Sequence, residues 1–189
     1  MIKDIKNFTS TMAALKDLMD MSSSQEKMQE TMSILEQQIK EYKPKIGISF
    51  VNKSDNPDPF YNYGSDSGFD LLSNGEVVIP AKSWTIVPTG LYFDIPYGYE
   101  IQVRSKSGLA LNKGVSVLNS PGTVDSGYNG EIKVILMNNS TMDITIHKGM
   151  KVAQAVLVPV LNGDSVNLNK VNEINEKDRN ANGFGSTGV

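Results

Sequence analysis

From residue 46 onward, short runs rich in Val, Ile, Tyr and Thr alternate with turn-forming segments, and this pattern constrains the fold more than any other feature. The turn formers are clusters of Gly, Pro, Asn and Asp such as "SDNPDP", "YGSDSG" and "DSGYNG". Many short strands at spacings of roughly 8 to 12 residues are typical of an all-β sandwich or jelly roll. No helical period of useful length interrupts them. The predicted strand segments are 46–51, 75–80, 83–88, 90–96, 99–105, 114–119, 130–138, 142–149 and 151–160.

Residues 1–43 differ in composition from the rest of the chain, because they contain no glycine or proline and hold six of the nine methionines. Their apolar residues recur at steps of three and four, the spacing of amphipathic helices. The segment "SSSQE" at 22–26 offers an N-cap followed by Gln and Glu, which predicts a break near residue 22. We therefore expect two helices. Two roles are open for these helices. Their apolar faces pack on each other or on the body of the protein, or the helices mediate self-association or the docking of a protein partner.

The length of 189 residues suits one domain with a real core plus appendages. We expect an α-helical N-terminal extension over residues 1–45, a β-barrel over 46–165 and a flexible C-terminal arm over 166–189. The chain grows polar after Leu161 and closes with "NGFGSTGV", a run too rich in glycine for a regular element. Such a tail either frays or becomes ordered around a ligand, with its backbone N–H groups and hydroxyls toward phosphates.

Composition excludes several classes of function. The absence of cysteine excludes disulfides, thiolate nucleophiles and cysteine-based zinc sites, and the single histidine, His147, cannot build a His-rich metal site alone. No apolar run approaches 18 residues and the N-terminus lacks the apolar core of a signal peptide, so we expect a soluble cytoplasmic or otherwise intracellular protein with no membrane partner. The net charge of −3 argues against direct binding of nucleic acid.

Five segments place polar residues where a β-barrel does not need them, namely 68–73, 104–110, 119–131, 149–154 and the tail. The only arginines, Arg104 and Arg179, each stand just before a glycine-containing polar run, and a guanidinium suits phosphate or carboxylate. In this order and spacing, the five segments resemble the five motifs of the trimeric dUTPase family, the deoxyuridine triphosphate nucleotidohydrolases. The resemblance covers about residues 46–189, and "GTVDSGYNGE" and "GFGSTG" are its most specific parts.

The resemblance implies a mainly β fold, the dUTPase-like jelly-roll β-barrel, in a homotrimer with three active sites at subunit interfaces. It implies that the C-terminal arm reaches a neighbouring active site and closes it. The implied reaction is hydrolysis of dUTP to dUMP and pyrophosphate by attack of water on the α-phosphorus, with Mg²⁺ as cofactor. This reaction limits uracil in DNA and supplies dUMP for dTMP synthesis.

The longest motif carries the implied catalytic and nucleoside-binding residues. Asp125 matches the family's catalytic aspartate, which orients and deprotonates the water; without the motif it would be an ordinary turn aspartate. Tyr128 matches the tyrosine that packs against the deoxyribose and leaves no room for a 2′-hydroxyl. Asn119 and the backbone around Gly122 and Val124 match the hairpin that reads the polar edge of uracil and leaves no space for the methyl group of thymine.

The implied phosphate-binding residues lie in two other motifs. Ser107 and Gly108 match the phosphate-contacting motif, and Gln154 matches a glutamine that faces the same region. Lys106 stands where the family usually has arginine, so it keeps the charge but loses the bidentate fork that the family's arginine offers to the catalytic aspartate. Asp70 matches an aspartate expected to hold Mg²⁺ through water, since Mg²⁺ keeps several waters and takes oxygens from the triphosphate.

The tail carries the last implied residues. Phe184 is expected to stack on uracil, and Arg179, Ser186 and Thr187 are expected to contact the β- and γ-phosphates, with Gly185 in the same substrate-binding run. Exclusion of water there would strengthen each charge interaction.

Two other functions stay open at this point. A dCTP deaminase shares the fold and part of the motif pattern, but its catalytic glutamate should fall near Ile135, and an isoleucine cannot transfer a proton. A non-catalytic dUTPase-like module that senses nucleotide or binds a protein is the other alternative.

Overall fold

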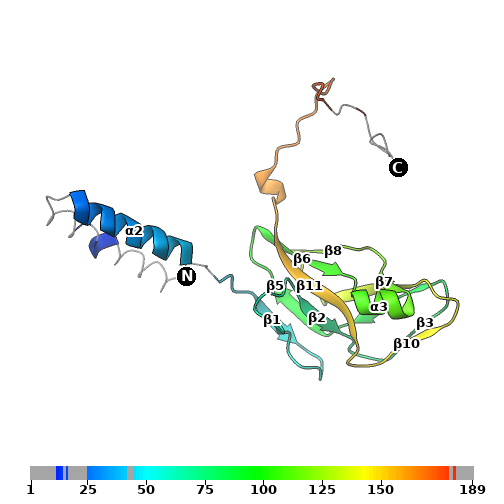
Figure 1. The fold of residues 1–189 in the computed structure, drawn as a ribbon. Helices are drawn as coiled ribbons and strands as arrows, with labels where there is room; N and C mark the ends of the chain where they lie inside the picture. Colours follow the sequence, from blue (N-terminus) through cyan, green and yellow to red (C-terminus); the bar gives the residue numbers. More distant parts are fainter. Residues whose placement is uncertain (1–11, 15, 17–24, 42–44, 179–180, 182–189) are drawn as a thin grey trace. The chain divides into compact units, whose positions relative to one another are not determined.

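The computed structural model describes residues 12–14, 16, 25–41, 45–178 and 181 (Figure 1). The chain divides into two compact units, Met1–Ile46 and Gly47–Val189. The first unit contains α2 (Gln25–Glu41), and residues 12–14 and 16 are also helical. Glutamate, glutamine, methionine and leucine, all good helix formers, dominate α2. The helical character predicted for the extension is confirmed in these residues, while the expected break near residue 22 lies outside them.

The second unit consists mainly of short antiparallel strands, which confirms the mainly β fold. Its two larger sheets have the strand orders β2-β11-β6-β8 and β4-β9-β7, and two strand pairs, β1-β5 and β10-β3, complete it. The strands are β1 (Ser49–Asn52), β2 (Phe69–Leu72), β3 (Val77–Ile79), β4 (Trp84–Pro88), β5 (Leu91–Asp94), β6 (Tyr99–Arg104), β7 (Val115–Val117), β8 (Gly122–Asp125), β9 (Lys133–Asn138), β10 (Ile144–Ile146) and β11 (Lys151–Pro159).

The core lies on the inner faces of the strands, because successive side chains of a strand point to opposite sides. Strand β6 buries Ile101 and Val103, whereas its other residues are partly exposed. Strand β9 likewise buries Val134 and Leu136, and these side chains belong to one continuous apolar cluster. The outer face of the sheet β2-β11-β6-β8 is therefore free to carry polar side chains, and its strands include the candidate site residues Asp70, Gly122, Val124, Asp125 and Gln154.

Two strands, β2 and β8, were not predicted from the sequence. Each alternates inward and outward residues, so Phe69 is buried while Asp70 is only partly buried, and Gly122 is buried while Thr123 is exposed. The polar residues that set these segments apart in the sequence, Asp70, Thr123 and Asp125, occupy outward positions of regular strands. The sequence shows no helical period of useful length beyond residue 46, but a short helix, α3 (Ser107–Lys113), and a 3₁₀ turn, η1 (Gly163–Ser165), are present there. Seven residues are too few to show a helical period.

After β11 the described chain contains only η1, and its apolar side chains at Leu161, Leu168 and Ile174 are exposed. The flexible arm expected over residues 166–189 stays a prediction. No helix among the described residues has the length and apolar character needed to cross a membrane.

Candidate active site

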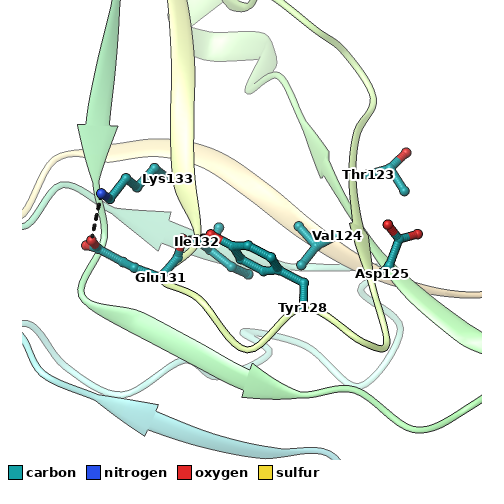
Figure 2. Close-up of a pocket in the computed structure, with 7 residues that line it drawn as sticks. All are labelled: Thr123, Val124, Asp125, Tyr128, Glu131, Ile132 and Lys133. Atoms are coloured by element: carbon teal, nitrogen blue, oxygen red, sulfur yellow. Dashed lines mark hydrogen bonds and ion pairs between the residues drawn. The ribbon is translucent and has the colours of Figure 1, made fainter.

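A cavity of about 220 Å³ lies beside the end of β8. Its lining combines one carboxylate, one aromatic ring, one ion pair and aliphatic groups, and consists of Thr123, Val124, Asp125, Tyr128, Glu131, Ile132 and Lys133 (Figure 2). Asp125 ends β8 and begins a tight turn, in which the amide of Tyr128 donates to the carbonyl of Asp125 at 3.0 Å. The intervening serine and glycine favour such a turn. This turn brings the carboxylate and the phenol to the same cavity.

Asp125 is solvent-exposed, and its carboxylate has no hydrogen-bond or ion-pair partner among the described residues. Figure 2 shows its side chain beside that of Thr123, on the opposite side of the strand from Val124. The residue directly opposite Asp125 on β6 is Glu100, also an acid. An ionised carboxylate only accepts hydrogen bonds, so the free Asp125 can orient a water molecule or take a proton from it.

The position of Tyr128 is fixed by its neighbours. Its hydroxyl donates to the carbonyl of Glu131 at 3.0 Å, and a Cβ on Gly130 would overlap the phenol oxygen. The Glu131 carboxylate accepts from the amide of Gly90 at 2.8 Å, which ties this loop to β5. The ring is held in place while 48% of the residue stays exposed, so it can pack against a ligand.

The connection between β7 and β8, strands of two different sheets, carries the candidate uracil-reading residues, of which Val124 lines the cavity. It contains Asn119 and a cis Ser120–Pro121 peptide bond. A Cβ on Gly122 would lie 3.2 Å from Nδ2 of Asn119 and 3.3 Å from Cβ of Val103, so the amide packs closely over the glycine. Asn119 and Gly122 are thus in contact, and Val124 lies two residues further along the same strand.

A second group of charges, the lysine–aspartate cluster of Asp70, Lys106 and Lys151, lies at the other end of the sheet. The Lys106 ammonium contacts Oδ1 of Asp70, and the Lys151 ammonium lies 2.7 Å from Oδ2. The Asp70 side chain is 15% exposed. Burial raises the pKa of this carboxyl, but the hydrogen bonds and charges of the two lysines outweigh it and hold the pKa below its usual value. Asp70 is therefore ionised at neutral pH.

The remaining phosphate-binding candidates of the described chain adjoin this cluster. Gln154, on β11, pairs with Asp70 on β2 and with Arg104 on β6, and its amide donates to the carbonyl of Ser105 at 3.1 Å. Ser107 and Gly108 directly follow Lys106 and open α3. The structure therefore brings together the phosphate-binding candidates Lys106, Ser107, Gly108 and Gln154 and the Mg²⁺ candidate Asp70, and their roles stay predictions.

A single chain does not bring Asp125 to this cluster. Asp125 lies opposite Glu100, four residues along β6 from Arg104, a distance of about 13 Å at the usual rise of a strand. Asp70 and Asp125 are also three strands apart, which adds about 14 Å across the sheet. Along β6, Arg104 donates to Gln102 and Gln102 donates to Glu100, so a hydrogen-bonded ladder occupies the face between them. Within the chain, Lys106 pairs with Asp70 and not with the catalytic candidate.

The described residues do not form a protein-built magnesium site. Both oxygens of Asp70 contact ammonium groups, and no group of three or more acids or histidines that could hold a metal ion occurs in the described part of the chain. A water-mediated hold of Asp70 on Mg²⁺ stays a prediction, which these ion pairs argue against. The tail residues Arg179, Phe184, Gly185, Ser186 and Thr187 lie outside the described residues.

The sequence motifs gave no role to Lys151 or Glu131, although these residues lie in the polar segments 149–154 and 119–131. Simple alternation along a strand puts Lys151 and Gln154, three residues apart, on opposite faces. The register of β11 against β2 shifts between Lys151 and Ala153, and that irregularity reverses the expectation. The role of Glu131 in anchoring the Tyr128 loop depends on a contact with Gly90, which is distant in sequence, and no local pattern indicates it.

Fold and sequence both relate this chain to known proteins. The dUTPase of Staphylococcus bacteriophage 80alpha, solved with dUpNHpp, has a similar fold, with a TM-score of 0.69, 24% identity and coverage of 77% of this chain and 100% of that one. A mutant dUTPase from phage phi11 of S. aureus, whose structure shows a structural Mg(II) ion, has a TM-score of 0.61 at 22% identity, covering 68% of this chain and 98% of that one.

The sequence relationship is stronger. The deoxyuridine 5′-triphosphate nucleotidohydrolase of Nautilia profundicola is 45% identical over 130 residues, 69% of this chain and 89% of that protein. The enzyme of the same name from Hydrogenobaculum sp. is 48% identical over 133 residues, 69% of this chain and 90% of that protein. A family model described as dUTPase matches residues 54–188. The chain therefore belongs to the dUTPase family, and residues 1–53 lie outside the matched region.

Proposed function

We propose that this protein is a dUTP diphosphatase, which hydrolyses dUTP to dUMP and pyrophosphate in the cytoplasm. The reaction limits uracil in DNA and supplies dUMP for dTMP synthesis. The observation that carries the proposal is the free carboxylate of Asp125 beside the fixed ring of Tyr128 at one cavity, in a chain of the dUTPase family. Family membership supports the reaction, and the local geometry supports the residue roles.

In the proposed reaction, Asp125 accepts a hydrogen bond from water and takes its proton as the water oxygen attacks the α-phosphorus. The bond from that phosphorus to the bridging oxygen breaks, and pyrophosphate leaves with the electron pair. Water can bind the carboxylate without displacing a side chain, because Asp125 has no partner among the described residues. General-base catalysis of this kind contributes about 10²–10⁴ in rate.

Substrate selection is proposed to come from the same loop. The ring of Tyr128 packs against the deoxyribose, so a ribose 2′-hydroxyl would clash with it. Asn119 and the backbone at Gly122 and Val124 read uracil. A wrong base leaves a buried donor or acceptor unpaired there, which is an efficient form of discrimination. Phe184 stacks on the base from the tail.

The triphosphate is proposed to lie along the positively charged end of the sheet. Its contacts are Lys106, Ser107, Gly108 and Gln154, joined from the tail by Arg179, Gly185, Ser186 and Thr187. Mg²⁺ is proposed to enter as part of the substrate, bound to the triphosphate oxygens, where it neutralises phosphate charge. No step is assigned to a metal held by protein ligands.

The proposal requires an oligomer, and the dUTPase resemblance makes it a homotrimer. Asp125 and the lysine–aspartate cluster are too far apart in one chain to act on the same triphosphate, so one subunit must supply Asp125 and another the cluster. Each site then lies at a subunit interface, and the C-terminal arm closes it. The N-terminal extension is assigned no part in the reaction. Met28 and Met32 on α2 are exposed, so docking of a protein partner through residues 1–43 stays a proposal of its own.

The deaminase alternative has no support in the structure. Ile135, near which the deaminase glutamate would fall, lies on β9 opposite Ile86 of β4. The residues that line the cavity do not include it.

Release of pyrophosphate by the purified chain tests the proposal. With Mg²⁺, the protein is offered dUTP, dTTP, dCTP and UTP in parallel, and Asp125→Asn serves as the control. We expect release from dUTP alone, with a loss of about 10³-fold in the variant. No release from any nucleotide by a folded protein would favour the non-catalytic binding module instead.

A further inference from the structure

A bulge in β11 turns Lys151 to the face of the sheet opposite the one that regular alternation predicts. Lys151 pairs with Leu72 of β2, but Ala153 pairs with Leu71, so one extra residue is inserted between them. Val152 and Ala153 are consequently both buried, and Lys151 and Gln154 lie on the same face of the sheet. Bulges are common next to active sites because they redirect side chains in this way.

The redirected lysine reaches the phosphate-binding candidates. Its ammonium lies 2.7 Å from Oδ2 of Asp70, whose other oxygen contacts Lys106. Two ammonium groups and one carboxylate leave the cluster with a net positive charge. The side chain of Lys151 is 53% exposed, so its ammonium keeps donors free for a ligand.

We propose that Lys151 is a second phosphate-binding cation of the active site, held in position by Asp70 and acting beside Lys106. This inference rests on the proposed function, because the phosphates are those of the nucleotide. A lysine ammonium is a compact point charge with three donors, suited to a phosphate oxygen. Lysine in place of arginine at 106 keeps the charge but loses the bidentate fork, and the second ammonium supplies further donors toward the phosphates.

An ordinary surface ion pair on the same turn offers a contrast. Lys148 contacts Asp55 at 2.5 Å, and that carboxylate is 89% exposed and has a single lysine partner in the described chain. Asp70 is mostly buried and holds two lysines. Exposed pairs contribute little to stability or binding, so Lys148 is a matched control for Lys151.

The test measures binding of inorganic tripolyphosphate to the full-length chain by calorimetry, in EDTA and at low salt. We compare the wild type with Lys151→Gln, Lys151→Arg and Lys148→Gln. The inference predicts that Lys151→Gln weakens binding about tenfold, the loss of one charge-assisted hydrogen bond. Lys151→Arg should restore most of the affinity, and Lys148→Gln should change it by less than about twofold.

The same variants are then assayed for dUTP hydrolysis, with circular dichroism and light scattering to verify fold and assembly. Lys151→Gln should raise the KM for dUTP while leaving Mg²⁺-saturated kcat within about threefold, the pattern of lost binding to ground and transition states alike. Equal behaviour of Lys151→Gln and Lys148→Gln, or no tripolyphosphate binding by the wild type, would overturn the inference while leaving dUTP hydrolysis intact. Absence of hydrolysis in the wild type would instead overturn the proposed function.

Discussion

At the scale of single residues, two aspartates of similar sequence context have opposite surroundings. Asp70 and Asp125 both occupy outward positions of strands, yet Asp70 is held by two lysines while Asp125 has no partner in the described chain. The motifs identified both residues from the sequence. They could not identify the partners, because Lys106 is 36 positions away from Asp70 and its contact depends on the pairing of β2, β11 and β6.

The pH dependence of stability should report the ion pairs of Asp70. Its pKa is lower in the folded than in the unfolded protein, so the pairs stabilise the fold fully above the unfolded value of 3.8. That stability is lost as the pH falls through the folded value. We expect Asp70→Asn to lower the free energy of unfolding by about 2 kcal/mol at pH 7. The difference from wild type should shrink as the pH falls below about 4.

Urea unfolding at a series of pH values measures this difference. Asp55→Asn is the control, because its ion pair is exposed and should contribute little at any pH. A difference for Asp70→Asn that stays constant down to pH 3 would mean that the lysines do not stabilise its charged form.

The geometry of Tyr128 should depend on the absence of a side chain at residue 130. In Gly130→Ala, the added methyl overlaps the phenol and displaces the ring from its hydrogen bond to Glu131. We expect the KM for dUTP to rise about tenfold, consistent with loss of roughly 1.4 kcal/mol of binding. Steady-state kinetics measure this. Gly127→Ala, where a Cβ meets nothing within 4 Å, should behave as wild type; an equal effect of both changes would refute the steric argument.

At the scale of elements, the sequence predicted strands well where both ends are marked by turn formers and the residues are apolar. Strands β4, β5, β6 and β9 lie within the predicted segments. It missed β2 and β8, because each has only four residues, too few to show a clear alternation. It could not show the bulge of β11, since a register shift depends on the partner strand. Functional elements are where local patterns are expected to fail as predictors.

The C-terminal end of α3 offers a prediction for an element boundary. Gly114 has φ 63° and its amide closes the helix on the carbonyl of Ala110. A Cβ there would make only ordinary contacts, with Ser140 N at 3.6 Å, so only the left-handed backbone penalises a side chain. Gly114→Ala should lower the free energy of unfolding by about 1 kcal/mol, and Gly114→Asn by less, because asparagine tolerates this conformation. Chemical denaturation measures both; equal losses would contradict the backbone explanation.

At the scale of the whole molecule, the proposed function assigns the two halves of the site to two subunits. The proposed function assigns nucleoside binding and water activation to residues near Asp125 and phosphate binding to residues near Asp70, and the sheet separates the two groups within one chain. Through the motifs, the sequence predicted which residues form the site. It gave no information about their separation, because the distance between them depends on the order of strands in the sheet.

Mixing two inactive variants tests this division. Asp125→Asn and Lys106→Met chains, each inactive alone, are unfolded together, refolded in equal amounts and assayed. If each site takes Asp125 from one subunit and Lys106 from another, random trimers should restore about a quarter of the wild-type sites. If both residues acted within one chain, every site would keep one lesion and no activity would return.

Hydrolysis of dUTP in ¹⁸O-labelled water tests the central claim most directly. Mass spectrometry of the products locates the oxygen taken from water, for the wild type and for Asp125→Asn. Attack on the α-phosphorus with Asp125 as the base predicts one ¹⁸O in dUMP, unlabelled pyrophosphate, and loss of the labelled product in the variant. Label in pyrophosphate, or undiminished formation of labelled dUMP by Asp125→Asn, would contradict this account.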